Sequence, residues 1–288
     1  MSKLTDLGHR LSNGVLRVGK QMLRPLRFST RLRVGSWVGR KLLVRLPAAR
    51  KRFDRNIELI FPKMSMQARR TFLEKVGDNT GRVLIEEMFM DEVVHHHERF
   101  RSSGPGWDAY RAALQDGKGA LMVSAHFGNW EGMRIISRFN FDAEVAGVYR
   151  PHNNPYYNDD FVSALNTISP QNFPKGRHGT RDLVRHLRGG GVAAILIDQK
   201  QSGSPLIPFL GQPAETTLTA AKLAKSQGIP VYPALTYRNE DGVTFDCWLG
   251  DAILHDEDEV MMRAMNDALS AKILERPEQW FWFHRRWR

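Results

Sequence analysis

Cysteine is almost absent from this sequence, since Cys247 is the only one among 288 residues. One thiol cannot form an internal disulfide, and without a Cys-x-x-Cys pair there is no thiolate zinc site, so a reducing environment facing the cytoplasm is the simplest inference. Cys247 lies in the strand-like run Val243–Trp248, where we expect it to be a small buried residue.

Long apolar runs are also missing. A helix that spans a bilayer needs about 20 predominantly apolar residues, and charged residues interrupt every candidate window in this chain. No apolar core with a small-residue cleavage site follows Lys3, so we expect no secretory signal peptide. Together these absences argue against an integral membrane protein.

Acidic residues are scarce in the first 55 positions, which hold fifteen Lys and Arg against Asp6 and Asp54, a net charge of +13. The whole chain has a net charge of +11, so the remaining residues sum to −2. Apolar residues recur at helical spacing in this basic segment, at Leu4, Leu7, Leu11, Val15, Val18 and Met22, and again at Leu32, Trp37, Val38, Leu42 and Leu46. This pattern predicts amphipathic helices with cationic faces, which gain about 1 kcal/mol per Lys or Arg near an anionic membrane surface.

The basic segment has two other interpretations. Lys and Arg also neutralise nucleic-acid phosphates, and a basic helix can simply be solvated. No recognition-helix, zinc-finger or base-stacking signature accompanies the charge, so we expect no nucleic-acid partner. We divide the chain into a basic amphipathic membrane-associating segment, residues 1–50, and a second domain, residues 51–288, which carries the motifs described below.

Beyond residue 55 the pattern alternates between helix and strand. Ser65 is placed to cap a long helix that runs toward Met90. Further strands are predicted at Ala120–Val123, Glu144–Tyr149, Val192–Ile197 and Val231–Tyr237, and helices at Trp107–Leu114, Asn158–Leu165, Thr180–Leu187 and Thr217–Ser226. The alternation predicts an α/β fold with a central, mostly parallel sheet flanked by helices.

A histidine and a glutamate five positions apart follow the first of these strands, in the segment Ser124–Gly132. Ligands bind at the carboxyl edge of open α/β sheets, and His126 should lie at that edge. Gly128 allows a sharp turn, after which Glu131 can face back toward the imidazole. A neutral His that is oriented by a carboxylate can remove the proton of an alcohol, so the pair predicts acyl or similar group transfer to a hydroxyl. The alternative is a packed, hydrogen-bonded histidine.

Two other strand ends carry candidate residues. Arg150 follows a strand that we expect beside the His126 strand, and it precedes Pro151, so its guanidinium should project into the same cleft. There it would hold a phosphate or stabilise an oxyanion; the alternative is an ion pair with Asp159 or Asp160. Asp198 and Gln199 follow Val192–Ile197 and would position substrate or support the basic residues, unless they only cap a turn.

The chain resembles the late acyltransferases of lipid A biosynthesis, which belong to the wider glycerolipid acyltransferase group with a His, four residues, then Asp or Glu. The resemblance rests on blocks in the same order along the chain: Arg55–Pro62, His126–Glu131, Gly147–Pro151 with Asn154, Ile197–Gln199, Pro208–Gly211 with Pro213–Thr216, and Arg276–Trp287. The better-known members carry an N-terminal hydrophobic anchor, and this sequence departs from them there.

The resemblance implies transfer of a fatty acyl chain from an acyl carrier protein thioester to a hydroxyl of a lipid A precursor. It implies that His126 is the general base with Glu131 as its partner, that Asn129, Arg150, Asp198 and Gln199 bind substrate, and that no cofactor or metal takes part. With the basic amphipathic segment and the missing apolar span, we expect a peripheral or monotopic protein on the cytoplasmic face of the inner membrane.

Several alternatives stay open. The acceptor could be another glycolipid, an aminolipid or a lysophospholipid, the donor could be coenzyme A, and the chain could be a non-catalytic membrane-binding relative.

Two clusters of residues allow other interpretations. Adjacent His95, His96 and His97 do not point at one ion, so we expect no metal there. The terminal run Trp280–Arg288 resembles a membrane-interface belt, but we expect at least half of it in the core.

Overall fold

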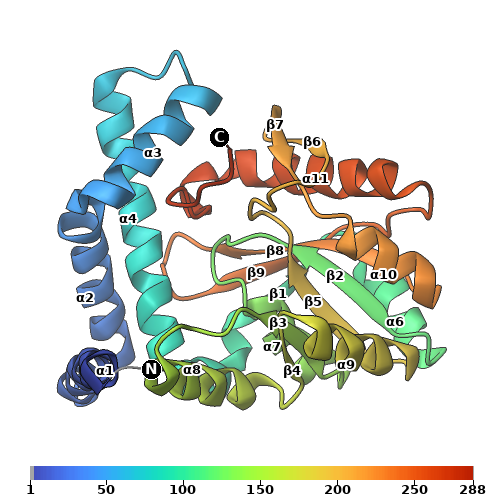
Figure 1. Cartoon of the computed structure of the whole chain (residues 1–288), viewed down its shortest axis with the longest axis horizontal. Coiled ribbons are helices and arrows are strands. Elements are labelled where there is room, and N and C mark those ends of the chain that lie inside the picture. Colours follow the sequence, from blue (N-terminus) through green and yellow to red (C-terminus); the bar gives the residue numbers. More distant parts are fainter. Residues whose placement is uncertain (1–2, 288) are drawn as a thin grey trace.

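The computed structural model of the chain describes residues 3–287, and the side chains from residue 5 onward. Arg288, the last residue of the terminal aromatic and basic run, therefore lies outside the described residues, as does the side chain of Leu4. An α/β body forms most of the molecule, and a layer of N-terminal helices lies along one side of it (Figure 1).

A seven-stranded sheet in the order β1-β9-β8-β2-β5-β3-β4 forms the centre of the body. Its neighbouring strands are parallel except for β8 and β9, which are antiparallel. The strands are β1 (Phe100–Ser103), β2 (Ala120–Ser124), β3 (Val145–Tyr149), β4 (Asn172–Pro174), β5 (Val192–Leu196), β8 (Val231–Arg238) and β9 (Phe245–Leu249). A separate antiparallel pair is formed by β6 (Leu206–Phe209) and β7 (Gln212–Glu215).

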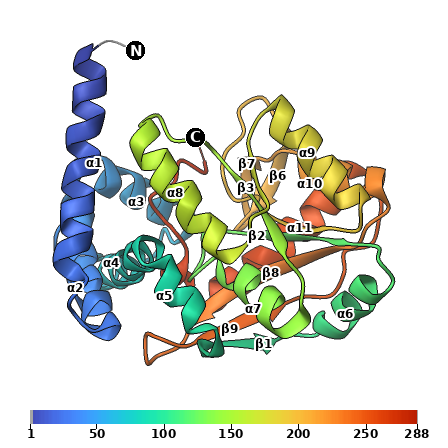
Figure 2. The same cartoon turned by 90° about the horizontal axis from the view of Figure 1, so that it is seen from below.

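Helices cover both faces of the sheet and build the N-terminal layer (Figures 1 and 2). The body carries α6 (Trp107–Gln115), α7 (Gly132–Phe141), α8 (Pro155–Ile168), α9 (Arg177–Arg188), α10 (Thr219–Gln227) and α11 (Asp258–Glu275). The N-terminal layer consists of α1 (Lys3–Leu23), α2 (Phe28–Lys41), α3 (Pro47–Ile60), α4 (Met66–Met88) and α5 (Met90–His95). Short 3-10 turns lie at Leu43–Arg45, His97–Arg99 and Pro277–Gln279.

The central strand β2 shows why these residues form a buried sheet. All five of its residues are buried. Leu121 and Val123 contact the apolar cluster on one face of the sheet, whereas Ala120 and Met122 contact the cluster on the other face. A parallel strand covered on both faces needs apolar side chains at every position, which is why the sequence here is a continuous apolar run and does not alternate.

The predicted elements are confirmed with shifts of a few residues at their ends. Ser65 caps α4, because its Oγ accepts a hydrogen bond of 3.2 Å from the backbone N–H of Ala68. Cys247 is fully buried in β9. One prediction about strand order is wrong. The strand that ends at Arg150, β3, does not lie beside β2, because β5 pairs with both of them and separates them.

Helices α2 and α4 pack closely against each other through glycine. A Cβ atom added at Gly39 would overlap the backbone carbonyl of Gly77, and one added at Gly81 would overlap that of Gly35. Small residues let two helix backbones approach closely. This contact fixes α4 against α2 within the N-terminal layer.

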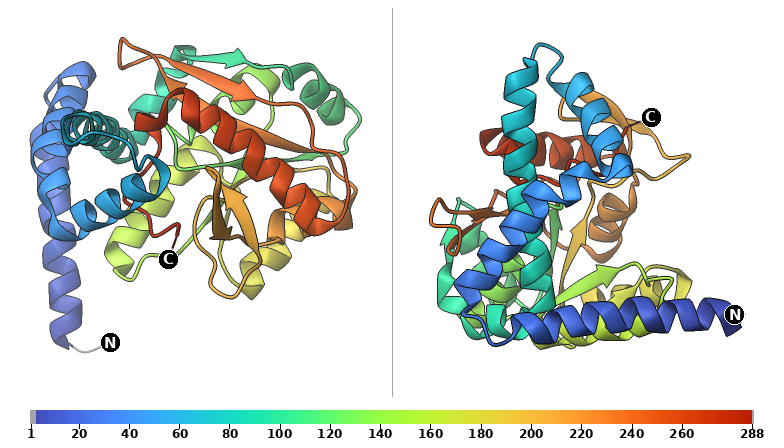
Figure 3. Two further views of the ribbon diagram at one scale, coloured as in Figure 1. Left: turned by 90° about the horizontal axis from the view of Figure 1, so that it is seen from above. Right: turned by 90° about the vertical axis from the view of Figure 1, so that its left-hand side faces the viewer.

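Helix α1 lies along the edge of the molecule beside α8 (Figures 2 and 3). Its contacts with α8 are polar: Arg17 forms an ion pair of 2.7 Å with Asp160, and Asn13 donates to the same carboxylate. The aliphatic residues of α1 are exposed instead, at Leu7, Leu11, Val15, Leu16, Val18 and Met22. Among the described residues, no helix combines the length and apolar character needed to cross a bilayer.

Candidate active site

His126 lies two residues beyond the end of β2. Its backbone is fixed on both sides, since its N–H donates to Asp198 Oδ2 at 2.9 Å and its carbonyl accepts from the N–H of Phe281 at 2.9 Å. Gly128 makes the turn after it, with a φ of +54°, and a Cβ atom there would overlap the carbonyl of Thr236. Glycine is needed at this position both for the left-handed backbone and for the close approach of β8.

The partner of the His126 ring is Asp198. Nδ1 of His126 lies 2.8 Å from Oδ1 of Asp198, while the side chains are 18% and 0% exposed. Trp280 Nε1 donates to the other carboxylate oxygen at 2.9 Å. Burial opposes ionisation of Asp198, but the charge of His126 and the hydrogen bonds from its ring and backbone outweigh burial and hold the pKa of Asp198 far below its usual range. An ionised Asp198 favours the tautomer with Nδ1 protonated, in which Nε2 carries the free lone pair.

Glu131 was predicted to orient this ring, and in the structure a different residue contacts it. Glu131 Oε2 accepts a hydrogen bond of 2.7 Å from Arg134, whose guanidinium also donates to Asn172 and to the carbonyl of Val145. Arg134 is buried and needs a carboxylate nearby. The orienting carboxylate is therefore supplied by Asp198, and Glu131 faces the same cavity with its charge balanced by Arg134.

The cavity beside His126 has a volume of about 270 Å³. It brings together four of the six predicted site residues: His126, Glu131, Arg150 and Gln199. Arg150 is exposed, and no ion pair joins it to a carboxylate in the described part of the chain; Asp160 pairs with Arg17 instead. Glu87 of α4 also lines the cavity, and burial, followed by the nearby charges of Glu131 and Glu86, raises its pKa to about 8. The apolar part of the wall is formed by Trp130, Val148, Phe161, Leu165 and Ile195.

Asn129 does not line this cavity. It is buried, its Nδ2 donates to Glu86 Oε2 at 3.1 Å, and its Oδ1 accepts from the N–H of Glu131 at 3.2 Å. Glu86 in turn pairs with the buried Arg238, whose Nη2 lies 2.8 Å from the same oxygen. Asn129 therefore connects the loop that carries His126 and Glu131 to an ion pair between α4 and β8.

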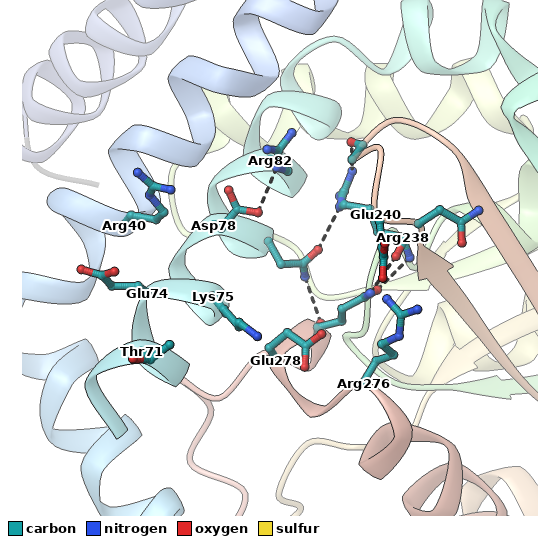
Figure 4. Close-up of a pocket in the computed structure, with 14 residues that line it drawn as sticks. Arg40, Thr71, Glu74, Lys75, Asp78, Arg82, Arg238, Glu240, Arg276 and Glu278 are labelled. Atoms are coloured by element: carbon teal, nitrogen blue, oxygen red, sulfur yellow. Dashed lines mark hydrogen bonds and ion pairs between the residues drawn. The ribbon is translucent and has the colours of Figure 1, made fainter. Parts of the chain in front are cut away.

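The same network continues to a second, polar cavity of about 530 Å³, which is lined mainly by α4, the end of β8 and the C-terminal segment (Figure 4). Arg238 Nε donates to Asn79 Oδ1 at 3.0 Å, and the carbonyl of Gln279 accepts from both Asn79 and the N–H of Gly128. The turn at Gly128 is thus tied to α4 and to the C-terminal segment by hydrogen bonds with buried partners.

A second histidine lies close to the first. The ring centroids of His126 and His284 are 4.5 Å apart. Ligand atoms of His126, Asp198 and His284 all lie within 4.8 Å of one another, which is close enough for a metal ion. However, both oxygens of Asp198 already accept N–H hydrogen bonds, from His126 and Trp280. The arrangement is that of a carboxylate surrounded by donors. Sequence reasoning did not identify four supporting residues: Trp280 at Asp198, His284 beside His126, Arg134 at Glu131 and Glu86 at Asn129.

The terminal aromatic run is mostly core, as predicted: Trp280, Trp282, Phe283 and Trp287 are buried, and the side chain of Arg286 is buried with them.

Comparison with known proteins gives the family. Residues 11–288 match the model of the bacterial lipid A biosynthesis acyltransferases. The chain is 26% identical to the lipid A biosynthesis lauroyltransferase of Escherichia coli K12, over 96% of this chain and 90% of that protein. It is 28% identical to a lipid A biosynthesis acyltransferase of Haemophilus influenzae, over 90% and 81%, and 24% identical to a phosphatidylinositol mannoside acyltransferase of Mycobacterium tuberculosis, over 63% and 58%. The chain therefore belongs to the bacterial lipid A biosynthesis acyltransferase family and is an enzyme that transfers acyl groups.

Proposed function

We propose that this enzyme transfers a fatty acyl chain from an acyl carrier protein thioester to a hydroxyl of a lipid A precursor, with His126 as the general base. The observation that carries the proposal is the hydrogen bond between His126 Nδ1 and the ionised Asp198, which leaves Nε2 of a cavity-lining imidazole without a hydrogen-bond partner in the described part of the chain. A general base needs a free nitrogen in reach of the substrate and a fixed tautomer.

In the proposed reaction Nε2 accepts the proton of the acceptor hydroxyl as its oxygen attacks the thioester carbonyl carbon. The tetrahedral oxyanion then re-forms the carbonyl, the carbon–sulfur bond breaks, and the imidazolium returns its proton to the departing thiolate. The products are an ester and a free thiol. No acyl-enzyme forms, and Ser124, whose hydroxyl is buried, does not line the cavity.

Arg150 and Glu131 provide the charges in this scheme. The Arg150 guanidinium stabilises the oxyanion, an effect worth about 3 to 4 kcal/mol for a well-placed donor. The carboxylate of Glu131 stabilises the imidazolium through space, with Arg134 fixing its position. Gln199 contributes a further polar contact to the substrate, whereas Asn129 and Asp198 act by positioning Glu131 and His126.

The apolar wall of the same cavity receives the acyl chain. Each buried methylene contributes about 0.8 kcal/mol, so the length of the groove sets the preferred chain length. The donor protein is acidic, and a cationic surface on this chain recruits it. Helix α9 supplies such a surface next to the cavity: Arg177, Arg181, Arg185 and Arg188 are exposed, and Lys175, just before the helix, lines the cavity.

The enzyme works as a peripheral protein on the cytoplasmic face of the inner membrane. Helix α1 supports this proposal because its polar residues face α8 and its aliphatic residues face outward. A stripe of exposed aliphatic side chains that is flanked by Lys and Arg is typical of a helix that lies in the headgroup region.

A second acceptor class has a specific observation in its favour. Phosphatidylinositol mannoside acyltransferases are among the relatives of this chain, so its relatives include proteins named for a different acceptor. Mass spectrometry of membrane lipids with and without the protein separates the two acceptors, because the acylated species differ in mass.

The direct test is His126→Ala, assayed with radiolabelled acyl carrier protein and, in a parallel arm, with acyl-coenzyme A. We expect the variant to retain the wild-type circular dichroism spectrum and to lose at least about 10²-fold in rate. A near-wild-type rate would rule out the proposed base. If the wild-type enzyme were active with acyl-coenzyme A but not with the acyl carrier protein, only the proposed donor would be rejected.

A further inference from the structure

A third cavity, of about 300 Å³, lies between α3 and the C-terminal segment. Four basic side chains line it: Lys51, Arg52 and Arg55 from α3, and Arg285 from the other end of the chain. None of the described residues that line it is acidic. The basic N-terminal segment and the basic C-terminal run, which lie more than 200 residues apart in sequence, therefore meet at one place; the C-terminal segment, in red, lies near α3 in Figure 1.

Carboxylates do not neutralise this charge. No ion pair joins Lys51, Arg55 or Arg285 to an acidic residue within residues 3–287, and the nearby Asp54 is paired with Arg50 at 2.7 Å. Arg52 makes one long contact, of 3.5 Å, with the carbonyl of Phe283. Four cations around one small cavity attract an anion strongly, because the same potential acts on it from several sides.

Two residues that line the cavity each carry a buried polar atom without a hydrogen-bond partner in the described part of the chain. Nε1 of Trp287 and Nε2 of His284 are buried and make no hydrogen bond in the described part of the chain. Trp287 is only 6% exposed. An indole N–H can only donate, so its missing partner is an acceptor. Both atoms are nearly inaccessible to solvent, so the exposed side chains of Lys51, Arg55 and Arg285 are the groups that a ligand in the cavity would contact.

The third cavity adjoins the catalytic residue. His284 lines it, and the His284 ring is 4.5 Å from that of His126, which lines the cavity with the apolar wall. Asn56 of α3 holds the two segments together, since its Nδ2 donates to the carbonyls of Trp282 and His284 at 2.9 Å each. The His126 imidazole therefore lies between a cavity with an apolar wall and a cavity that basic but no acidic described residues line.

We propose that the cavity formed by Lys51, Arg52, Arg55 and Arg285 binds a phosphate group on the head group of the lipid acceptor. This inference rests on the proposed function, because it assigns the acceptor, and not the acyl donor, to the basic side of His126. Arginine binds phosphate oxygens through two parallel N–H groups, which fixes the orientation of the ligand as well as its position. A head group held here would present a neighbouring hydroxyl to Nε2 of His126.

The test uses two acceptors: a disaccharide glycolipid that carries a phosphate monoester, and the same glycolipid after phosphatase treatment. The variants are Arg55→Ala and Arg55→Lys, and the matched control is Lys63→Ala. Lys63 is exposed just beyond α3 and lines none of these cavities, so the Lys63→Ala substitution removes one positive charge without altering the site.

We expect wild-type enzyme to prefer the phosphorylated acceptor through a lower KM. Arg55→Ala should raise that KM about 10-fold, which corresponds to about 1.4 kcal/mol, and leave the KM for the dephosphorylated acceptor unchanged. Arg55→Lys should restore part of the preference, because it keeps the charge but not the bidentate geometry. Equal KM values for the two acceptors in wild-type enzyme would overturn the inference and leave the proposed function intact, as would equal effects of Arg55→Ala and Lys63→Ala.

A binding measurement separates this inference from the proposed reaction. Inorganic phosphate is titrated calorimetrically into wild type, Arg55→Ala and Lys63→Ala. Weaker binding in Arg55→Ala alone supports an anion site in this cavity, and identical binding in all three proteins overturns it. If wild-type enzyme acylates neither glycolipid, the proposed function fails, and weaker phosphate binding in Arg55→Ala then identifies free phosphate as the ligand.

Discussion

Asp198 Oδ1 lies 2.8 Å from Nδ1 of His126, although the two residues are 72 positions apart in the sequence. The register of the sheet produces this contact. Strands β2 and β5 are parallel with Ser124 opposite Leu196, and each functional residue follows its strand by the same two positions. Residues at equal distances beyond aligned parallel strands emerge side by side at the carboxyl edge, where ligands bind in this class of sheet.

Asp198→Asn should lower kcat by roughly 10²- to 10⁴-fold while the protein stays folded. The Asn carbonyl can still accept from the His126 backbone and from Trp280, but its NH₂ group would face Nδ1 of the ring. The imidazole would then carry its proton on Nε2 and lose its basic nitrogen. Steady-state kinetics and thermal unfolding measured together check this, and unchanged kcat would contradict the assigned role of Asp198.

Glu131→Gln should lower the rate by about 10²-fold with a small loss of stability, because Gln keeps a hydrogen-bond acceptor for Arg134 while removing the charge. Glu131→Ala should lose activity by a comparable factor and should also destabilise the fold by about 3 to 5 kcal/mol, since it leaves the buried Arg134 without its carboxylate. Denaturant unfolding distinguishes the two variants. A Gln variant with wild-type activity would mean that the charge of Glu131 has no part in catalysis.

Arg238→Met should reduce the free energy of unfolding by about 3 to 5 kcal/mol, because Glu86 would become a buried, unpaired charge. Adding Glu86→Gln to this variant should recover much of the loss, as the unpaired charge is then removed and Asn129 keeps its acceptor. Urea unfolding of the single and double variants tests this. If the double variant is no more stable than Arg238→Met alone, an unpaired charge on Glu86 is not the cause of the lost stability.

Glu87→Gln should flatten the dependence of stability on pH. The folded-state pKa of Glu87 is about 8, above its ordinary value of 4.5, so the folded protein binds more protons than the unfolded protein between these values. Stability is therefore lost as pH rises from about 5 to 8, by about 1.4 kcal/mol per unit at most. The variant should match wild type near pH 4.5 and exceed its stability at pH 8.5. Thermal unfolding of the wild type and the variant, measured from pH 4.5 to 8.5, checks this. Equal losses of stability in the two proteins as the pH rises would contradict the prediction.

Leu11→Ser with Val15→Ser should weaken binding to vesicles that contain anionic phospholipid by at least about 10-fold, since each aliphatic side chain contributes about 1.5 to 3 kcal/mol when fully buried. Both residues are exposed on α1, so the fold should be unaffected. Leu254→Ser is the matched control, because Leu254 is 86% exposed on a loop of the α/β body. Vesicle flotation that gives equal binding for all three proteins would reject α1 as the membrane contact.

The fold class and most element positions follow from local pattern. Buried parallel strands need continuous apolar runs, and Ala120–Val123 and Val192–Ile197 supply them at the right length. Strand order does not follow from such runs, because every apolar strand is compatible with every neighbour. The apolar pattern alone therefore allows β3 beside β2, whereas in the structure β5 lies between them.

The sequence by itself determined that His126 ends a strand beside a turn that requires glycine, that a basic segment precedes the α/β body, and that Arg150, Asp198 and Gln199 follow other strands of the sheet. Each of these depends on residues within a few positions of one another. The tertiary structure decided which acid holds the imidazole, where Asn129 points, and that Lys51, Arg55 and Arg285 surround one cavity. Those relationships depend on strand register and on contacts between distant segments, which local chemistry does not encode.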